Sequence, residues 1–236
     1  MNKDPRRGKE NIRKSTGYSY LLFLLMLVVP AAFAIEAGQI DDFEDGTTAG
    51  WAKGTPSNNP PTNVASGGPD GVDDNFLRSE STGGTGADSR QVVFNRSQWT
   101  GSYADAGVTT IRLNVRNSGG TMLNVRIAIK SGVTWFSAST AKQVVANSDW
   151  QTAEFELNDS QMTRVAGTMT LEAVLANVTE MRILSSNSAA FRGDAIVSTI
   201  DVDNIEAISA AAGDRDGDGV PDDEDAFPDD PNEQFD

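Results

Sequence analysis

The 236-residue chain contains no cysteine and no histidine. Without cysteine it forms no disulfides, so a buried core, with or without bound metal, must stabilise the fold. Without histidine, the Ser-His-Asp and Cys-His nucleophile systems and histidine-ligated zinc are excluded. Basic residues are also scarce, 19 against 34 acidic ones, which gives a net charge of −15. Nucleic-acid binding is therefore not expected, because phosphate contacts need clustered lysine and arginine.

Long apolar runs are equally rare, and the clearest one lies near the N-terminus. A basic segment precedes the run Leu21–Val29, and Pro30 and an Ala32-x-Ala34 site follow it. This order predicts a secretory signal peptide over residues 1–34. The run is short for a membrane span, which needs about 20 residues, although an uncleaved N-terminal anchor is the alternative. We expect an exported protein, secreted, periplasmic or at the cell surface, with no membrane span after cleavage.

Residues 35–208 show the period of two that is typical of half-buried β-strands. The segments Thr110–Arg116 and Leu123–Lys130 alternate strictly, and Asn117–Gly120 between them predicts a hairpin turn. A third alternating strand is Trp150–Leu157. The remaining predicted strands are Ile40–Glu44, Asn75–Glu80, Ser89–Phe94, Thr134–Ala138, Glu180–Ser185 and Ile196–Ile208.

One segment departs from this period. Leu171, Val174, Leu175 and Val178 fall at the spacing of one helical face, which predicts a short helix. About nine strands with glycine-rich turns and one helix indicate an all-β domain, a β-sandwich.

The two ends of this domain resemble a known family. The opening Asp41–Gly46 with Gly50-Trp51, the middle Gly67–Gly71 with Phe76–Arg78, and the closing Asp201–Ile205 are similar to jelly-roll carbohydrate-binding modules and their galactose-binding-like and laminin-B-like relatives. The resemblance implies that the β-sandwich is a jelly roll whose last strand pairs near the first. It also implies that the domain binds a glycan or mediates adhesion. It also implies a structural calcium where the first and last strands meet, with Asp42, Glu44 and Asp203 as oxygen donors. The alternative is that these three residues are solvated strand residues.

Glycan binding by such a domain calls for exposed aromatic rings, because sugar faces stack on them. Trp135 and Trp99 lie nearest to predicted loops, and we expect them to be the glycan contacts, Trp135 first. The alternative for each is packing in the core. Glu154 and Glu156 share one strand face, but alternation places them towards solvent and no further acidic partner follows in the strand. The sequence therefore predicts no enzyme.

The C-terminal segment is acidic and regularly spaced. Beyond a linker at residues 209–213, residues 214–236 contain eleven acidic residues and one basic residue, Arg215. Carboxylates stand at positions 1, 3, 5, 9 and 12 of a loop with Gly219 at position 6, which is the ligand spacing of a calcium loop. Val220 would add its backbone carbonyl. The predicted ligands are Asp214, Asp216, Asp218, Val220, Asp222 and Asp225.

No helical pattern flanks this loop, so it is not a full EF-hand. The run from Asp214 to Glu233 instead resembles the thrombospondin type 3 repeat, a family in which aspartates bind calcium. The alternative is a solvated acidic tail. The sequence thus favours an exported, non-catalytic, calcium-binding module that recognises a carbohydrate or cell-surface ligand. A structural or adhesive protein without a sugar site is the second hypothesis, and it predicts that all tryptophans are buried.

Overall fold

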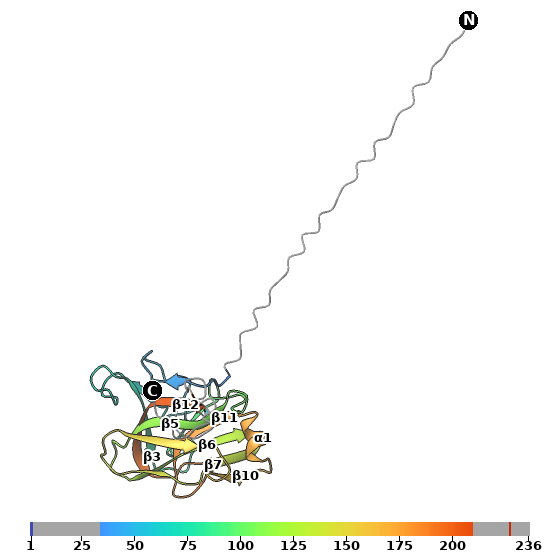
Figure 1. Cartoon of the computed structure of the whole chain (residues 1–236). Helices are drawn as coiled ribbons and strands as arrows, with labels where there is room; N and C mark the ends of the chain where they lie inside the picture. Colours follow the sequence, from blue (N-terminus) through green and yellow to red (C-terminus); the bar gives the residue numbers. More distant parts are fainter. Residues whose placement is uncertain (2–33, 210–226, 228–236) are drawn as a thin grey trace. The chain divides into compact units, whose positions relative to one another are not determined.

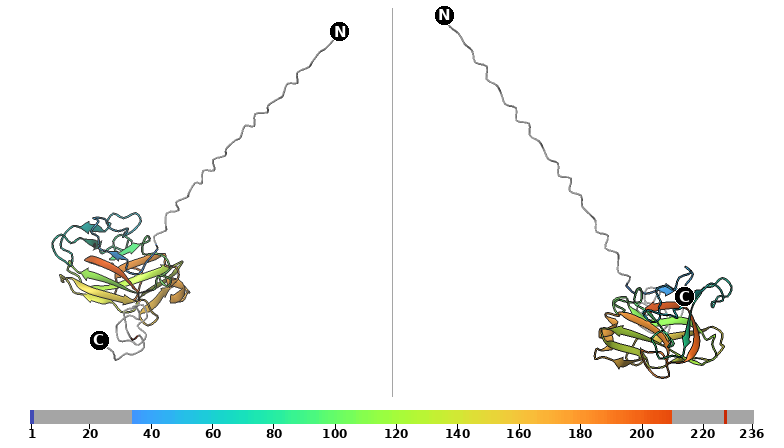
Figure 2. Two further views of the ribbon diagram at one scale, coloured as in Figure 1. Left: turned by 45° about the horizontal axis from the view of Figure 1, so that its top comes forward. Right: turned by 180° about the vertical axis from the view of Figure 1, so that it is seen from behind.

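The computed structural model describes Met1, residues 34–209 and Phe227. The described domain is a β-sandwich of two antiparallel sheets with one short helix, as the sequence predicts. Figure 1 shows β12 and β5 in one layer and β6 and β7 in the other, and Figure 2 shows the two layers stacked. In this part of the chain no helix is long and apolar enough to cross a membrane.

The first sheet, sheet A, has the strand order β2-β3-β12-β5-β9, with β1 paired to β12. Its strands are β1 (Ile40–Asp41), β2 (Thr62–Val64), β3 (Phe76–Thr82), β5 (Val108–Arg116), β9 (Gln151–Glu156) and β12 (Val197–Ser209). The pairing of β1 with β12 aligns Ile40 with Glu206, which confirms that the first and last strands meet.

The second sheet, sheet B, has the strand order β10-β7-β6-β11-β4, with β8 paired to β6. Its strands are β4 (Val92–Asn95), β6 (Leu123–Ser131), β7 (Thr134–Ala138), β8 (Lys142–Val144), β10 (Met162–Ala166) and β11 (Glu180–Ser185). Three of the twelve strands in the described part of the chain, β2, β8 and β10, were not predicted. They are short, and their partly polar sequences carry no clear period of two.

The expected hairpin between Thr110–Arg116 and Leu123–Lys130 is wrong. These segments become β5 and β6, and they lie in different sheets: β5 pairs with β12 and β9, whereas β6 pairs with β7, β8 and β11. Their apolar faces meet across the core instead of lying side by side. Asn117 stabilises the connection that leads from β5 in sheet A to β6 in sheet B. Its buried side chain donates to the carbonyls of Thr121 and Val144 at 2.8 and 3.1 Å.

The main core fills the space between the sheets. Ile111, Leu113 and Val115 project from β5, and residues of β6 and β11 face them from sheet B. The predicted helix is present as α1 (Leu171–Leu175). Its N-cap Thr170 accepts a hydrogen bond from the backbone N–H of Ala173 at 3.2 Å, and its buried residues are Leu171 and Val174.

A second, smaller apolar cluster lies on the outer face of sheet B. It consists of Val92, Ala128, Trp135 and Leu184, with Val165, Ala166 and Phe191 partly buried against it. Alternation along β11 turns Ile183 inward, so its neighbours in the strand point outward. An outer sheet face that carries its own aromatic cluster is where a ligand surface can form.

Candidate functional site

The outer face of sheet B carries a pocket of about 510 Å³. It is lined by residues of β4 and β11, by residues 54–55, by residues that precede and follow β4, and by the loop after β11. We call it the arginine pocket. Its charged and aromatic lining residues are Arg90, Arg96, Arg182, Arg192, Phe94 and Phe191.

A stack of rings and guanidinium groups builds one wall of this pocket. Phe191 lies on Trp135 with ring centroids 5.1 Å apart and an interplanar angle of 14°. The Arg182 guanidinium lies 4.3 Å from the Trp135 centroid and 5.9 Å from the Phe191 centroid. The Arg96 guanidinium lies 4.3 Å from the ring of Phe94. Such cation–π contacts hold flat groups in defined orientations.

Glu180 fixes the arginines from below. Its carboxylate is buried and pairs with Arg182 at 2.6 Å, with Arg96 at 2.9 Å and with Lys130 at 3.8 Å. Burial lowers the pKa of Arg182, and the nearby positive charges of Arg96 and Arg192 lower it further, while Glu180 opposes the shift. Arginine nevertheless stays charged at physiological pH. One carboxylate therefore orders three cations without neutralising them.

The loop between β11 and β12 is fastened to the sheet by backbone contacts. Arg182 donates to the carbonyl of Phe191 at 2.6 Å, and Arg90 donates to the carbonyl of Gly193 at 2.9 Å. Gly193 is buried, and a Cβ there would collide with the carbonyl oxygen of Gln91. Only glycine lets the loop lie this close, so Phe191 and Arg192 are held at the rim.

Neither predicted glycan contact presents its ring to solvent. Trp99 is fully buried, and its indole nitrogen donates to Asp41 at 2.7 Å. Trp135 is only 5 % exposed and is covered by Phe191 and Arg182. A sugar therefore cannot stack on Trp99, and Trp135 acts as the support beneath Phe191. Core packing, the alternative for each ring, fits both better. Trp99 belongs to the main core cluster, and Trp135 belongs to the smaller cluster on the outer face of sheet B.

Sequence reasoning did not identify Phe94, Phe191 or the four arginines. One local signal existed: Phe94 and Arg96 are two residues apart, so they share the strand face opposite Val93 and Asn95. Nothing local indicates that Arg182 and Arg192, far along the chain, join them.

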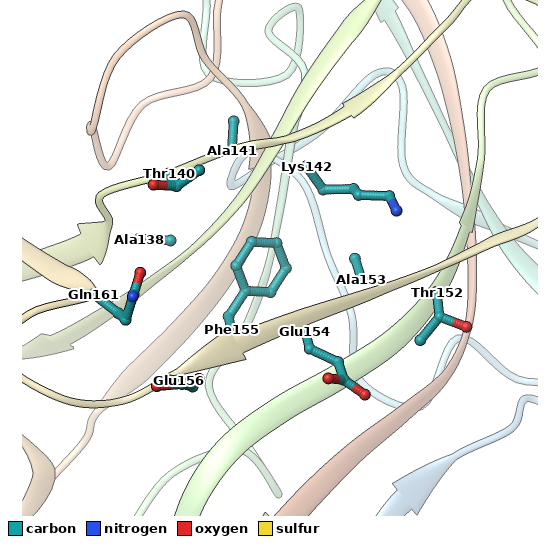
Figure 3. A pocket seen from close by; sticks show the side chains of 10 residues that line it. All are labelled: Ala138, Thr140, Ala141, Lys142, Thr152, Ala153, Glu154, Phe155, Glu156 and Gln161. Atoms are coloured by element: carbon teal, nitrogen blue, oxygen red, sulfur yellow. The ribbon is translucent and has the colours of Figure 1, made fainter.

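A larger cleft of about 720 Å³ opens between β9 and the β7–β8 connection. Figure 3 shows Phe155 pointing from β9 towards the segment that carries Thr140 and Lys142, while Glu154 points to the other side of the strand. Glu154 and Glu156 both line the cleft. A glycosidase needs two carboxylates that face each other across the sugar, whereas these two project from the same face of one strand. We call this opening the edge cleft.

The three carboxylates predicted to hold calcium near the first and last strands are close enough to influence one another. Asp203 is fully buried beside Asn204, a residue of φ +47° in a bulge of β12. Its Oδ2 has no hydrogen-bond partner within the described part of the chain. Burial, with the negative charges of Asp74, Glu44 and Asp42, raises its pKa to about 7.

These donors do not already form a closed metal site. Glu44 accepts from the backbone of Asn75 at 2.6 Å, and Asp42 accepts from the backbone of Glu44 at 3.2 Å. Among the described residues, no three acidic, histidine or cysteine side chains are arranged to hold a metal ion. The chemistry of the donors nevertheless suits calcium, a hard cation that takes carboxylate and carbonyl oxygens. The sequence did not identify Asp74 as a neighbour.

The calcium loop predicted from Asp214 to Asp225, including Asp216, Asp218, Val220 and Asp222, lies outside the described residues. The same holds for the predicted signal peptide up to residue 33. Both remain predictions.

No protein-family model matches the chain, and neither does any curated protein. Solved structures do match. A family 11 carbohydrate-binding module from Clostridium thermocellum, in complex with a β-1,3-1,4-mixed-linked tetrasaccharide, is 17 % identical with a TM-score of 0.49, over 75 % of this chain and 97 % of that one. An exo-β-agarase is 12 % identical with a TM-score of 0.53, over 76 % of this chain and 26 % of that one.

The adhesin domain of Lys-gingipain from Porphyromonas gingivalis is 12 % identical with a TM-score of 0.40, over 74 % of this chain and 99 % of that one. At these identities the likeness concerns the fold, and the agarase match supports the jelly-roll β-sandwich. The chain spans about a quarter of the agarase.

Proposed function

We propose that this chain is an exported, non-catalytic carbohydrate-binding module whose glycan lies in the arginine pocket. The observation that carries the proposal is the pair Phe94 and Phe191, which are partly buried aromatic rings that line one pocket together with arginine side chains. Aromatic faces stack on sugar rings, and guanidinium groups donate to sugar oxygens. A pocket with a few converging polar groups is also the usual form of a small-ligand site.

Rigidity supports the same conclusion. Phe191 is held by Trp135 beneath it and by Arg182 on its backbone carbonyl. A binding surface whose side chains are already ordered loses less conformational entropy when it binds.

The test is a screen of the purified full-length chain on a glycan array, followed by calorimetric titration with the best glycan. Phe191→Ala and Phe94→Ala should each weaken binding at least tenfold. A double variant of the edge cleft, Glu154→Gln with Glu156→Gln, serves as the control and should bind as the wild type does. Loss of binding in the control variant alone would show that the glycan binds in the edge cleft and not in the arginine pocket. Hydrolysis of the glycan that this double variant abolishes would contradict the non-catalytic proposal.

A structural or adhesive role without a sugar site is the second candidate, and one observation favours it. Trp51, Trp99 and Trp135 are buried, and Trp150 is half-buried with its indole nitrogen bonded to the carbonyl of Gly67 at 3.0 Å. Failure of every glycan to bind would select this candidate.

Calcium is the second part of the proposal. The spacing of Asp214, Asp216, Asp218, Asp222 and Asp225 supports one site in the C-terminal loop, with the carbonyl of Val220 as a further ligand. The unpartnered Oδ2 of Asp203 supports a second site with Asp42 and Glu44. Calcium is abundant outside the cell, so weak sites of this kind would be filled there and would act as structural clamps.

A further inference from the structure

The arginine pocket is positively charged in a protein that is strongly negative. The chain has a net charge of −15, yet four arginines line this one pocket and no acidic residue does. Glu180 lies beneath the pocket and pairs with Arg96 and Arg182. Within the described part of the chain, Arg90 and Arg192 have no carboxylate within 4.0 Å. The local charge is therefore opposite in sign to that of the whole protein.

Several guanidinium nitrogens of the arginines that line the pocket have no hydrogen-bond partner in the described part of the chain. Arg192 is exposed, and its guanidinium lies 5.3 Å from the ring centroid of Phe191. Arg96 uses its Nε for Glu180 and keeps a side chain that is 51 % exposed. Arg90 donates from Nε to the carbonyl of Thr85 and from Nη1 to the carbonyl of Gly193. The terminal nitrogens of Arg96 and Arg192 thus remain available to a ligand.

Keeping like charges together has an energetic cost that an uncharged ligand does not relieve. Arg96 and Arg192 both act on Arg182 as repelling charges and lower its pKa. An anion placed between them reverses the sign of that interaction, and the fork of a guanidinium group matches the two oxygens of a carboxylate or sulfate. A neutral sugar offers only hydroxyl groups, so in its hydrogen bonds with arginine just the donor is charged, and these bonds are weaker than those to an anion.

From this arrangement we propose that the arginine pocket binds an acidic polysaccharide, with a carboxylate or sulfate group held by Arg96 and Arg192 while a sugar ring packs on Phe191. The proposal rests on the carbohydrate-binding function above and names its substrate class. It also accounts for the rigid clamp that Arg90 and Arg182 place on the loop, because that clamp keeps Arg192 at the rim.

The test compares polysaccharides that differ in charge on a similar backbone. Polygalacturonate is paired with its methyl-esterified form, and carrageenan is paired with agarose. Binding to the full-length chain is measured by affinity electrophoresis and calorimetry at 0.15 M salt, where interactions beyond about 8 Å are screened. The acidic member of at least one pair should bind at least tenfold more tightly than its neutral partner. A difference in the polygalacturonate pair identifies a carboxylate as the bound group, and a difference in the carrageenan pair identifies a sulfate.

Arg192→Glu is the diagnostic variant, because Arg192 is exposed and its loss leaves no buried carboxylate unpaired. It should weaken binding of the acidic polysaccharide at least tenfold. Arg164→Glu is the matched control: it makes the same charge change at an exposed residue of β10 that does not line the pocket, and it should bind as the wild type does. Thermal unfolding checks that both variants fold.

The outcomes separate this inference from the proposed function. Equal binding of the acidic and neutral members overturns the acidic specificity and leaves carbohydrate binding in place. Binding to neither member of either pair, together with an empty glycan array, overturns both. Equal weakening by Arg192→Glu and Arg164→Glu would show attraction to overall charge and would also overturn the assignment to the pocket.

Discussion

The indole nitrogen of Trp99 donates a 2.7 Å hydrogen bond to the Oδ2 atom of Asp41. Trp51 donates to the same oxygen at 2.7 Å, so two tryptophans from separate segments share one carboxylate of the first strand. Burial raises the pKa of Asp41, and these hydrogen bonds oppose the shift. Trp99 is therefore a structural anchor for the start of the domain.

Replacing Trp99 with phenylalanine should lower the free energy of unfolding by about 2–4 kcal/mol. The variant leaves the buried Asp41 carboxylate with one donor fewer and opens a small cavity. Trp150→Phe is the matched control, because its indole bonds to a neutral carbonyl, and it should cost about 0.5–1.5 kcal/mol. Urea unfolding measures both. Equal losses of unfolding free energy in the two variants would show that the charge of Asp41 does not strengthen its hydrogen bond with Trp99.

Lys53 should make stability rise with pH in the alkaline range. Its side chain is 1 % exposed, and burial lowers its pKa to about 8, although Asp88 and Glu80 oppose the shift. The native protein therefore releases this proton near pH 8, whereas the unfolded chain keeps it up to about pH 10.5. Between these values the unfolded state binds more protons, so the free energy of unfolding increases with pH.

Lys53→Met removes this titrating group and keeps most of its volume. The difference in unfolding free energy between wild type and variant should change by up to about 1.4 kcal/mol per pH unit between pH 8 and 10.5. Urea unfolding at pH 7, 8, 9 and 10 measures it, and taking the difference removes the contribution of other groups. A difference that is constant with pH would show that Lys53 is solvated in the native protein.

Asp203 gives the opposite pH dependence and a calcium response. Its native pKa of about 7 lies above its ordinary value of 3.8, so its contribution to stability is complete below pH 3.8 and is lost as the pH rises to about 7. At pH 8 without calcium, Asp203→Asn should therefore be more stable than the wild type, because it removes a buried charge.

Calcium should reverse that order if Asp203 is a ligand. Both proteins in this comparison carry Asp216→Ala, which weakens the C-terminal loop. In 5 mM calcium the protein that keeps Asp203 should gain stability, and the protein that also carries Asp203→Asn should not. Thermal unfolding with calcium or with chelator measures the gain. The same gain in both proteins would exclude Asp203 as a ligand.

The C-terminal loop should bind calcium with a Kd on the order of 10⁻⁴–10⁻³ M, as extracellular modules do. Asp216→Ala removes the ligand at loop position 3 and should weaken binding at least tenfold. Asp229→Ala removes the same charge outside the loop and is the control. Calorimetric titration of the full-length chain measures all three proteins. Equal weakening by both variants would identify a plain acidic tail.

Much of the fold was predictable because strand alternation is a local property. Residues such as Ile111, Leu113 and Val115 place the inner face of β5, and the helix at Leu171–Leu175 follows from its own spacing. The error concerned pairing: the turn residues after Arg116 suggest a hairpin, yet β5 and β6 lie in opposite sheets. Alternation defines which face is buried but does not define the neighbouring strand.

The sequence by itself determined an all-β domain, a net charge of −15 and the exclusion of histidine- and cysteine-based chemistry. It also defined the spacing of the carboxylates in the acidic C-terminal segment. Only the tertiary structure decided where the arginine pocket forms. Phe94 and Arg96 come from β4, Arg182 comes from β11, and Phe191 and Arg192 come from the loop that follows. These residues meet because β4 and β11 are antiparallel neighbours, with Arg182 opposite Phe94. Such long-range pairing depends on the packing of the whole domain, which no short segment of sequence encodes.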